Sequence, residues 1–191
     1  MPDIEDLDDL LVPHRTVLVT GTIDEDFIER VQPILLTYAF QSADLTTILF
    51  DSTGGSVREG LRLYDYIRAM PGPTRGVVIG RCRSIAMVVL QACTERTATA
   101  HSAFHFHEVH CSLHDFARSR VSEVAYLLRE NLDLQHQIEE ILLNRSGMTL
   151  RQLRAHMREG EKHEVELTAA QALKIGLIDR IVIQPLAPVP D

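Results

Sequence analysis

Short apolar runs alternate with helical patterns through the first half of this chain, and that alternation limits the folds it can adopt. The runs are rich in β-branched and aromatic residues, which favour strands, while the segments between them have helical spacing. The expected elements are a strand over 16–20, a helix over 24–40, a strand over 46–50, a helix over 56–70 and a strand over 76–79 that Gly80 ends. Such a βαβ order predicts an α/β fold.

The second half continues the pattern with shorter pieces. A buried helix is expected over 84–92, and strands over 97–100, 103–106, 163–167 and 178–183. Capping boxes predict the starts of two helices, Thr149-x-x-Gln152 for a short one and Thr168-x-x-Gln171 for one that Gly176 closes.

One predicted helix is too long for a compact domain. Its apolar spacing runs from about residue 115 to 145, and a helix of about 30 residues spans roughly 45 Å. Part of it should therefore project and bury its apolar stripe against a partner.

Length and composition indicate one domain. The 191 residues are 45% hydrophobic and 24% charged, and they divide into an acidic segment over 1–14, a domain over 15–184 and a Pro-rich tail over 185–191. A net charge of −8 argues against binding to nucleic acid or an anionic membrane. The three cysteines lack disulfide spacing, no signal peptide is evident, and no apolar run is long enough to span a bilayer, so a cytoplasmic protein is expected.

Three separated features suggest a chemistry. Gly54 and Gly55 stand at a strand-to-helix turn, where backbone N–H groups can face an anion and form one side of an oxyanion hole. Ser84 opens a helix, where it is either a capping residue or a nucleophile. His107 would supply the base that a serine nucleophile needs.

The histidines also raise the question of a metal site. His101, His105, His107, His110 and His114 gather around Cys111, but their spacing matches no standard zinc motif. Surface or hydrogen-bonded histidines are the default interpretation, and neither a metal nor another cofactor is expected.

Five motifs in register resemble the ClpP family of serine peptidases, within the ClpP/crotonase superfamily. They are Asp51-Ser-Thr-Gly-Gly-Ser56 (family Asn-Ser-Pro-Gly-Gly), Glu59-Gly60-Leu61-x-Leu63-Tyr64-Asp65 (Ala-Gly-x-x-Ile-Tyr-Asp), Gly80-Arg-Cys-Arg-Ser84-Ile-Ala-Met87 (Gly-x-Ala-x-Ser-Met-x-Ala), Phe106-His107 (within Met-Ile-His-Gln-Pro) and Ala169-x-x-Ala172-x-x-x-Gly176-Leu-Ile-Asp179 (Ala-x-Glu-Ala-x-x-x-Gly-Leu-Ile-Asp). The resemblance covers nearly the whole chain.

The resemblance implies a fold of repeated ββα units, with the long helix as a projecting handle. It implies a self-compartmentalising peptidase in which Ser84 is the nucleophile, His107 the base, and the backbone N–H groups of Gly55 and Ile85 the oxyanion hole. Two heptameric rings would stack through the handle as a tetradecamer and act on peptides or unfolded proteins. The family's N-terminal loop, which helps to dock an AAA+ unfoldase, has no evident counterpart before residue 16, so this partner is less firmly expected.

The third member of the triad departs from the family pattern. Counting nine residues from Ser146-Gly147 leads to His156 where the family has Asp, and no Asp occurs between Asp133 and Asp179. The nearest carboxylates are Glu159, the preferred candidate, and Glu161; the third member is one of these, His156, or absent. Three other functions stay open: a catalytically impaired assembly subunit, a phage-type prohead protease and a crotonase-like CoA enzyme.

Overall fold

The computed structural model describes residues 11–110, 120–163 and 166–183, without the side chains of 160–163. A short 3-10 helix, η1 (Val12–His14), precedes the first strand. The strands are β1 (Thr16–Ile23), β2 (Thr46–Gly55), β3 (Thr74–Arg83), β4 (Glu95–Thr99), β5 (Ala103–His105), β6 (Leu167–Thr168) and β7 (Arg180–Val182). The helices are α2 (Glu25–Gln41), α3 (Val57–Arg68), α4 (Ile85–Leu90), α5 (Val121–Arg145), α6 (Leu150–His163) and α7 (Ala169–Lys174).

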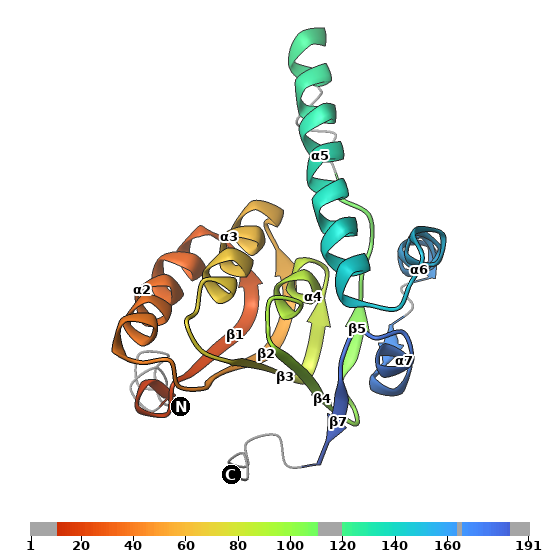
Figure 1. Ribbon diagram of the computed structural model, residues 1–191. Helices are drawn as coiled ribbons and strands as arrows, with labels where there is room; N and C mark the ends of the chain where they lie inside the picture. Colours follow the sequence, from red (N-terminus) through yellow and green to blue (C-terminus); the bar gives the residue numbers. More distant parts are fainter. Residues whose placement is uncertain (1–10, 111–119, 164–165, 184–191) are drawn as a thin grey trace.

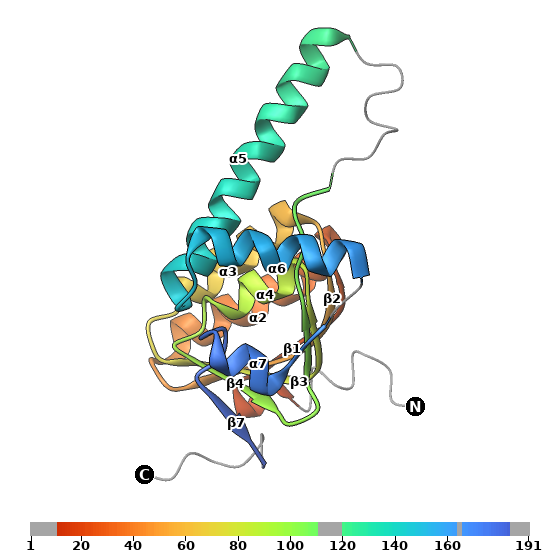
Figure 2. The same cartoon turned by 90° about the vertical axis from the view of Figure 1, so that its right-hand side faces the viewer.

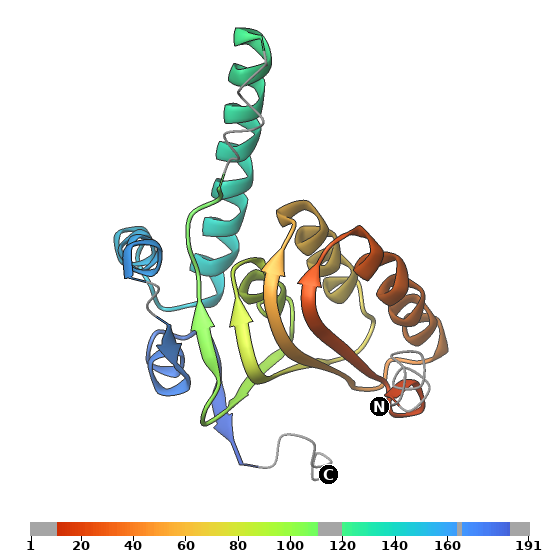
Figure 3. The same ribbon diagram turned by 180° about the vertical axis from the view of Figure 1, so that it is seen from behind.

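The strands form one sheet, in which the order β1-β2-β3-β4-β7 is parallel throughout. Helices α2, α3 and α4 lie together along one face of this sheet (Figures 1 and 3). The outer end of β3 pairs with β5, which in turn pairs antiparallel with β6. The predicted α/β class is confirmed. Because β5 pairs with the end of β3, the segment that follows β5 and contains His107 begins beside the segment that follows β3 and contains Ser84.

The first correction concerns Gly80, which does not end its strand. β3 continues to Arg83, and the register with β2 shifts from Phe50 opposite Val78 to Ser52 opposite Cys82. Gly80 has a φ of 108°, and a Cβ there would lie 2.7 Å from an oxygen of Asp51. The glycine therefore bends the strand past β2, so that its last residues can pair with β5.

The second correction concerns the strand expected over 163–167, of which residues 164 and 165 lie outside the described residues. Helix α6 continues to His163, and the strand β6 comprises only Leu167 and Thr168. Leu153 and Met157, at i and i+4, are both fully buried, so the amphipathic pattern extends the helix beyond the short one predicted. The two capping boxes are confirmed, because the Thr149 and Thr168 hydroxyls accept from the N–H groups of Gln152 and Gln171.

Helix α5 projects from the domain as predicted (Figures 1 and 2). It contains 25 residues, of which Ile138, Glu139 and Leu142, all in its C-terminal half, are buried. Tyr126 and Leu132 are 65% and 59% exposed, so the projecting half presents apolar side chains to solvent. Residues 111–119, which include the predicted start of this helix, lie outside the described residues.

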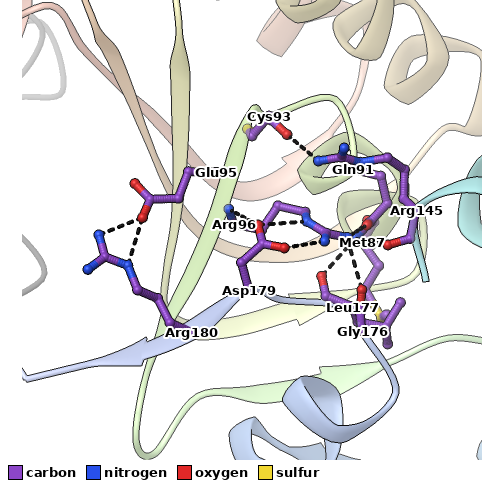
Figure 4. A network of polar contacts seen from close by, with 10 residues as sticks. All are labelled: Met87, Gln91, Cys93, Glu95, Arg96, Arg145, Gly176, Leu177, Asp179 and Arg180. Carbon is purple, nitrogen blue, oxygen red and sulfur yellow. Dashed lines mark hydrogen bonds and ion pairs between the residues drawn. The ribbon is translucent and has the colours of Figure 1, made fainter. Parts of the chain in front are cut away.

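A buried arginine connects the base of α5 to the rest of the domain (Figure 4). Arg96 on β4 is 5% exposed and pairs with Asp179, which precedes β7. Its guanidinium also donates to the carbonyl oxygens of Arg145 and Gly176, at 2.7 and 3.0 Å, and to the side chain of Gln91. Charge-assisted bonds of this kind fix the end of α4 against α5.

None of the helices in the described part of the chain combines the length and apolarity that a bilayer-spanning segment requires.

Candidate active site

Ser84 occupies the sharp turn between β3 and α4. Its backbone has φ 52° and ψ −129°, a region that side chains rarely adopt and that costs on the order of 1–3 kcal/mol. Its side chain makes no capping hydrogen bond, so the interpretation of Ser84 as a capping serine gains no support. The Ser84 N–H donates to the carbonyl oxygen of His105 at 2.7 Å, and every residue of α4 is buried. The turn is thus fixed by the hydrogen bond to β5 on one side and by the buried helix α4 on the other.

The Gly54–Gly55 turn packs against the nucleophile turn. A Cβ on Gly54 would lie 2.7 Å from the Cβ of Ser84 and 3.2 Å from the nitrogen of Ile85, so only glycine permits this approach. Gly55 has a φ of 154°, and a Cβ there would lie 2.3 Å from the carbonyl oxygen of Ile23. The two segments predicted to form the oxyanion hole therefore lie side by side.

His107 follows directly after β5 and Phe106. Its Nδ1 lies 2.6 Å from the carbonyl oxygen of Glu108. Because a carbonyl can only accept, this contact places the hydrogen of the neutral ring on Nδ1 and the lone pair on Nε2, the arrangement that a general base requires. The imidazole stacks on that of His110, with ring centroids 4.3 Å apart.

Ser84, His107, Gly55 and Ile85 all line one cavity of about 130 Å³. Such a volume has room for several water molecules or one side chain. The rest of the wall is mostly apolar: Val57, Val88, Phe106, Val109, Ile138, Leu142 and Met157, with Glu108 and His110 as the further polar residues. The structure thus brings together the nucleophile, the base and both oxyanion positions expected from the sequence.

The three candidates for a third catalytic member lie on α6. Glu159 is exposed, and the ring of His156 lies 6.1 Å from that of Phe106. Neither belongs to the described lining of the cavity, to which α6 contributes Met157. The side chain of Glu161 lies outside the described residues.

The segment that carries His107 is anchored to the handle by a network that sequence reasoning missed. The Val109 N–H donates to Gln135 on α5 at 2.8 Å, and the Gln135 amide donates to Glu139 at 3.1 Å. Glu139 is 5% exposed and receives two bonds from Arg154 of α6, at 2.7 and 2.8 Å. These bonds are the main cause that lowers the pKa of the Glu139 carboxyl. No local motif signals such a network, because its members come from three separate segments.

The histidine cluster takes no metal-binding form in the part of the chain that the structure describes. His105 and His110 each lie beside His107, yet no group of three or more potential ligands has suitable geometry there. Cys111 and His114, two members of the cluster, lie outside the described residues.

Comparison with known proteins agrees with this fold. A family model described as Clp protease matches residues 3–185. One similar relative is the ATP-dependent Clp protease proteolytic subunit 3 of Rhodococcus jostii (strain RHA1), which is 29% identical over 189 residues, covering 95% of this chain and 89% of the relative. With a match over nearly its whole length, this chain belongs to the Clp protease family.

Proposed function

We propose that this chain is a serine-type peptidase subunit of a ClpP-like self-compartmentalising ring. The observation that carries the proposal is the shared cavity, in which the strained turn of Ser84 meets His107 and the Gly55 and Ile85 backbone. A Clp protease family member with this arrangement has the parts for acyl transfer: a nucleophile, a base and an oxyanion site.

In the proposed mechanism, the Ser84 Oγ bonds to the carbonyl carbon of a peptide while Nε2 of His107 takes the hydroxyl proton. The negative oxygen that forms is held by the N–H groups of Gly55 and Ile85. The C–N bond then breaks, and His107 returns the proton to the leaving amine. Water attacks the acyl-enzyme by the same route and releases the acid.

A third residue that orients the imidazole would raise the rate further, and its loss typically lowers the rate by about 10⁴ without abolishing catalysis. Glu159 stays the first candidate, followed by His156 and Glu161. The carbonyl oxygen of Glu108 already orients Nδ1, which supports activity even where the family aspartate is missing. The residue that orients the imidazole is assigned by comparing kcat among three variants: Glu159→Gln, His156→Ala and Glu161→Gln.

For the assembly, we propose two stacked heptameric rings that bury the exposed apolar residues of α5, including Tyr126 and Leu132, between them. The name of the Rhodococcus relative includes ATP dependence, which supports an AAA+ unfoldase as a candidate partner. We also propose a cytoplasmic location, which is consistent with the ring assembly and with an AAA+ unfoldase as partner. Sedimentation of the wild-type chain and of a Tyr126→Glu/Leu132→Glu variant tests the handle, because the variant should stop at single rings.

The catalytic proposal is tested with a fluorophosphonate probe and mass spectrometry of the labelled peptide. Wild-type protein should be labelled at Ser84, Ser84→Ala should not be labelled, and His107→Ala should react far more slowly. Ser42→Ala, at a half-buried serine after α2, serves as the matched control and should label normally. A folded, assembled wild-type chain that leaves Ser84 unlabelled would instead be a non-catalytic assembly subunit.

A further inference from the structure

Glu108 places a carboxylate in the wall of the candidate active-site cavity. It is half-buried and lines the same space as Ser84, His107 and His110. The other walls are apolar, with Ile138, Leu142 and Met157 among them. A carboxylate in such surroundings lacks much of its hydration, so it gains from a cation that enters the cavity.

Among the described residues, no ion pair within 4 Å neutralises the charge of Glu108. This charge helps to raise the pKa of Arg154, so the two groups interact without forming such a pair. Arg154 is already held by two bonds to Glu139, so these two charges cancel. The group of Glu108, Glu139 and Arg154 therefore retains one net negative charge beside the cavity.

We propose that Glu108 is a specificity-determining residue, which selects peptides with lysine or arginine immediately before the bond that is cleaved. The inference rests on the proposed peptidase function. Because Ser84 and Glu108 line one cavity with room for one side chain, the residue whose carbonyl is attacked places its side chain there. The aliphatic stem of lysine packs along the apolar wall while its ammonium reaches the carboxylate.

The test compares peptides that differ in one group. The full-length assembled protein is given short fluorogenic peptides that end in lysine, in norleucine, which has a similar stem without the ammonium, or in glutamate. The kcat/KM for lysine should exceed that for norleucine at least about tenfold, as expected for a charge-assisted hydrogen bond, and glutamate should be cleaved worst. Higher salt should reduce the ratio.

Glu108→Gln should bring the ratio of lysine to norleucine close to one. Because the ratio is read within each variant, a general loss of rate cancels. Glu140→Gln makes the same charge change at an exposed residue of α5 that does not line the described cavity, and it should keep the wild-type ratio. A wild-type ratio near one, or an unchanged ratio in Glu108→Gln, overturns the proposal.

A measurement of peptide binding distinguishes failure of the cation-site proposal from failure of the proposed catalytic function. If no peptide is hydrolysed and Ser84 is not labelled, the peptidase proposal fails. Fluorescence anisotropy with the Ser84→Ala chain then measures peptide affinity directly. Binding of the lysine peptide about tenfold tighter than the norleucine peptide, and loss of that difference when Glu108→Gln is added, supports the cation site; equal affinities refute it.

Discussion

Gly60 should be unable to accept even a methyl group, because α3 lies directly against the first residue of α4. A Cβ at Gly60 would stand 2.1 Å from Cγ1 of Ile85 and 3.2 Å from its Cβ and Cδ1. Ile85 is 2% exposed and β-branched, so its side chain has little freedom to move away. Gly60→Ala must therefore push α3 away from the turn that carries Ser84.

Two opposing effects determine how much Gly60→Ala changes the free energy of unfolding. Alanine favours a helix interior over glycine by about 1 kcal/mol, while overpacking of a rigid core costs about 1–3 kcal/mol or more. We expect Gly60→Ala to lower the free energy of unfolding by about 1–2 kcal/mol. In an Ile85→Ala background the contacts with Cγ1 and Cδ1 are removed and only the 3.2 Å contact with Cβ remains, so the same change should be neutral or raise stability by up to about 1 kcal/mol. The coupling between the two sites is then about 1–3 kcal/mol.

Urea unfolding of the four proteins at one protein concentration measures this coupling. Gly147→Ala is the control, because a Cβ there meets nothing within 4 Å, and it should be neutral or slightly stabilising. Phosphonate labelling of Ser84 should slow in Gly60→Ala, since the backbone of Ile85 is the proposed oxyanion donor. Equal effects of Gly60→Ala in both backgrounds would refute the packing argument.

Three further predictions concern Arg154, Cys93 and Gly55. Arg154→Ala should lower the free energy of unfolding at pH 7, because it leaves the buried carboxylate of Glu139 without its charged partner, and by less than for a fully buried pair because Arg154 is half-exposed. Arg154 lowers the pKa of Glu139 below its ordinary 4.5, so this difference should be complete above that pH and shrink as pH falls through the folded pKa in acid titrations of stability. Burial raises the pKa of the Cys93 thiol to about 12, so iodoacetamide should modify it only in denatured protein, as peptide mapping would show. Gly55→Ala would bring a methyl group against the Ile23 carbonyl and should abolish labelling of Ser84 even where the chain still folds, with circular dichroism as the check.

The parts of the fold that were predicted correctly depend on local patterns. The starts of α2 and α3 follow from Asp24 and Ser56, whose side chains accept from the N–H groups of Phe27 and Glu59. The path of β3 beyond Gly80 could not be predicted in this way. It depends on pairing with β5, more than 20 residues away, and on a bend whose space is defined by Asp51 of another strand.

In the candidate site, too, the residues with local motifs could be predicted and those that depend on distant segments could not. Ser84 and His107 were expected together because each stands in a recognisable motif, and both line the cavity. Glu108 carries no motif of its own; its significance comes from the wall that surrounds it. Whether a third residue on α6 can reach His107 depends on how α6 lies against the β5 segment, which neither spacing nor composition reports.

The pairing of β3 with β5 sets the relation between the two proposed catalytic side chains. Arg83 stands opposite His105, and the Ser84 N–H donates to the His105 carbonyl oxygen, so the nucleophile follows one strand and the base follows the other by a fixed number of residues. A slip of one residue would turn the side chains of β5 to the opposite face and remove His107 from the cavity. Phe104, fully buried on β5, opposes such a slip because it would have to leave the core. The strained backbone of Ser84 can therefore persist, since a change of register would disturb both the core and this turn.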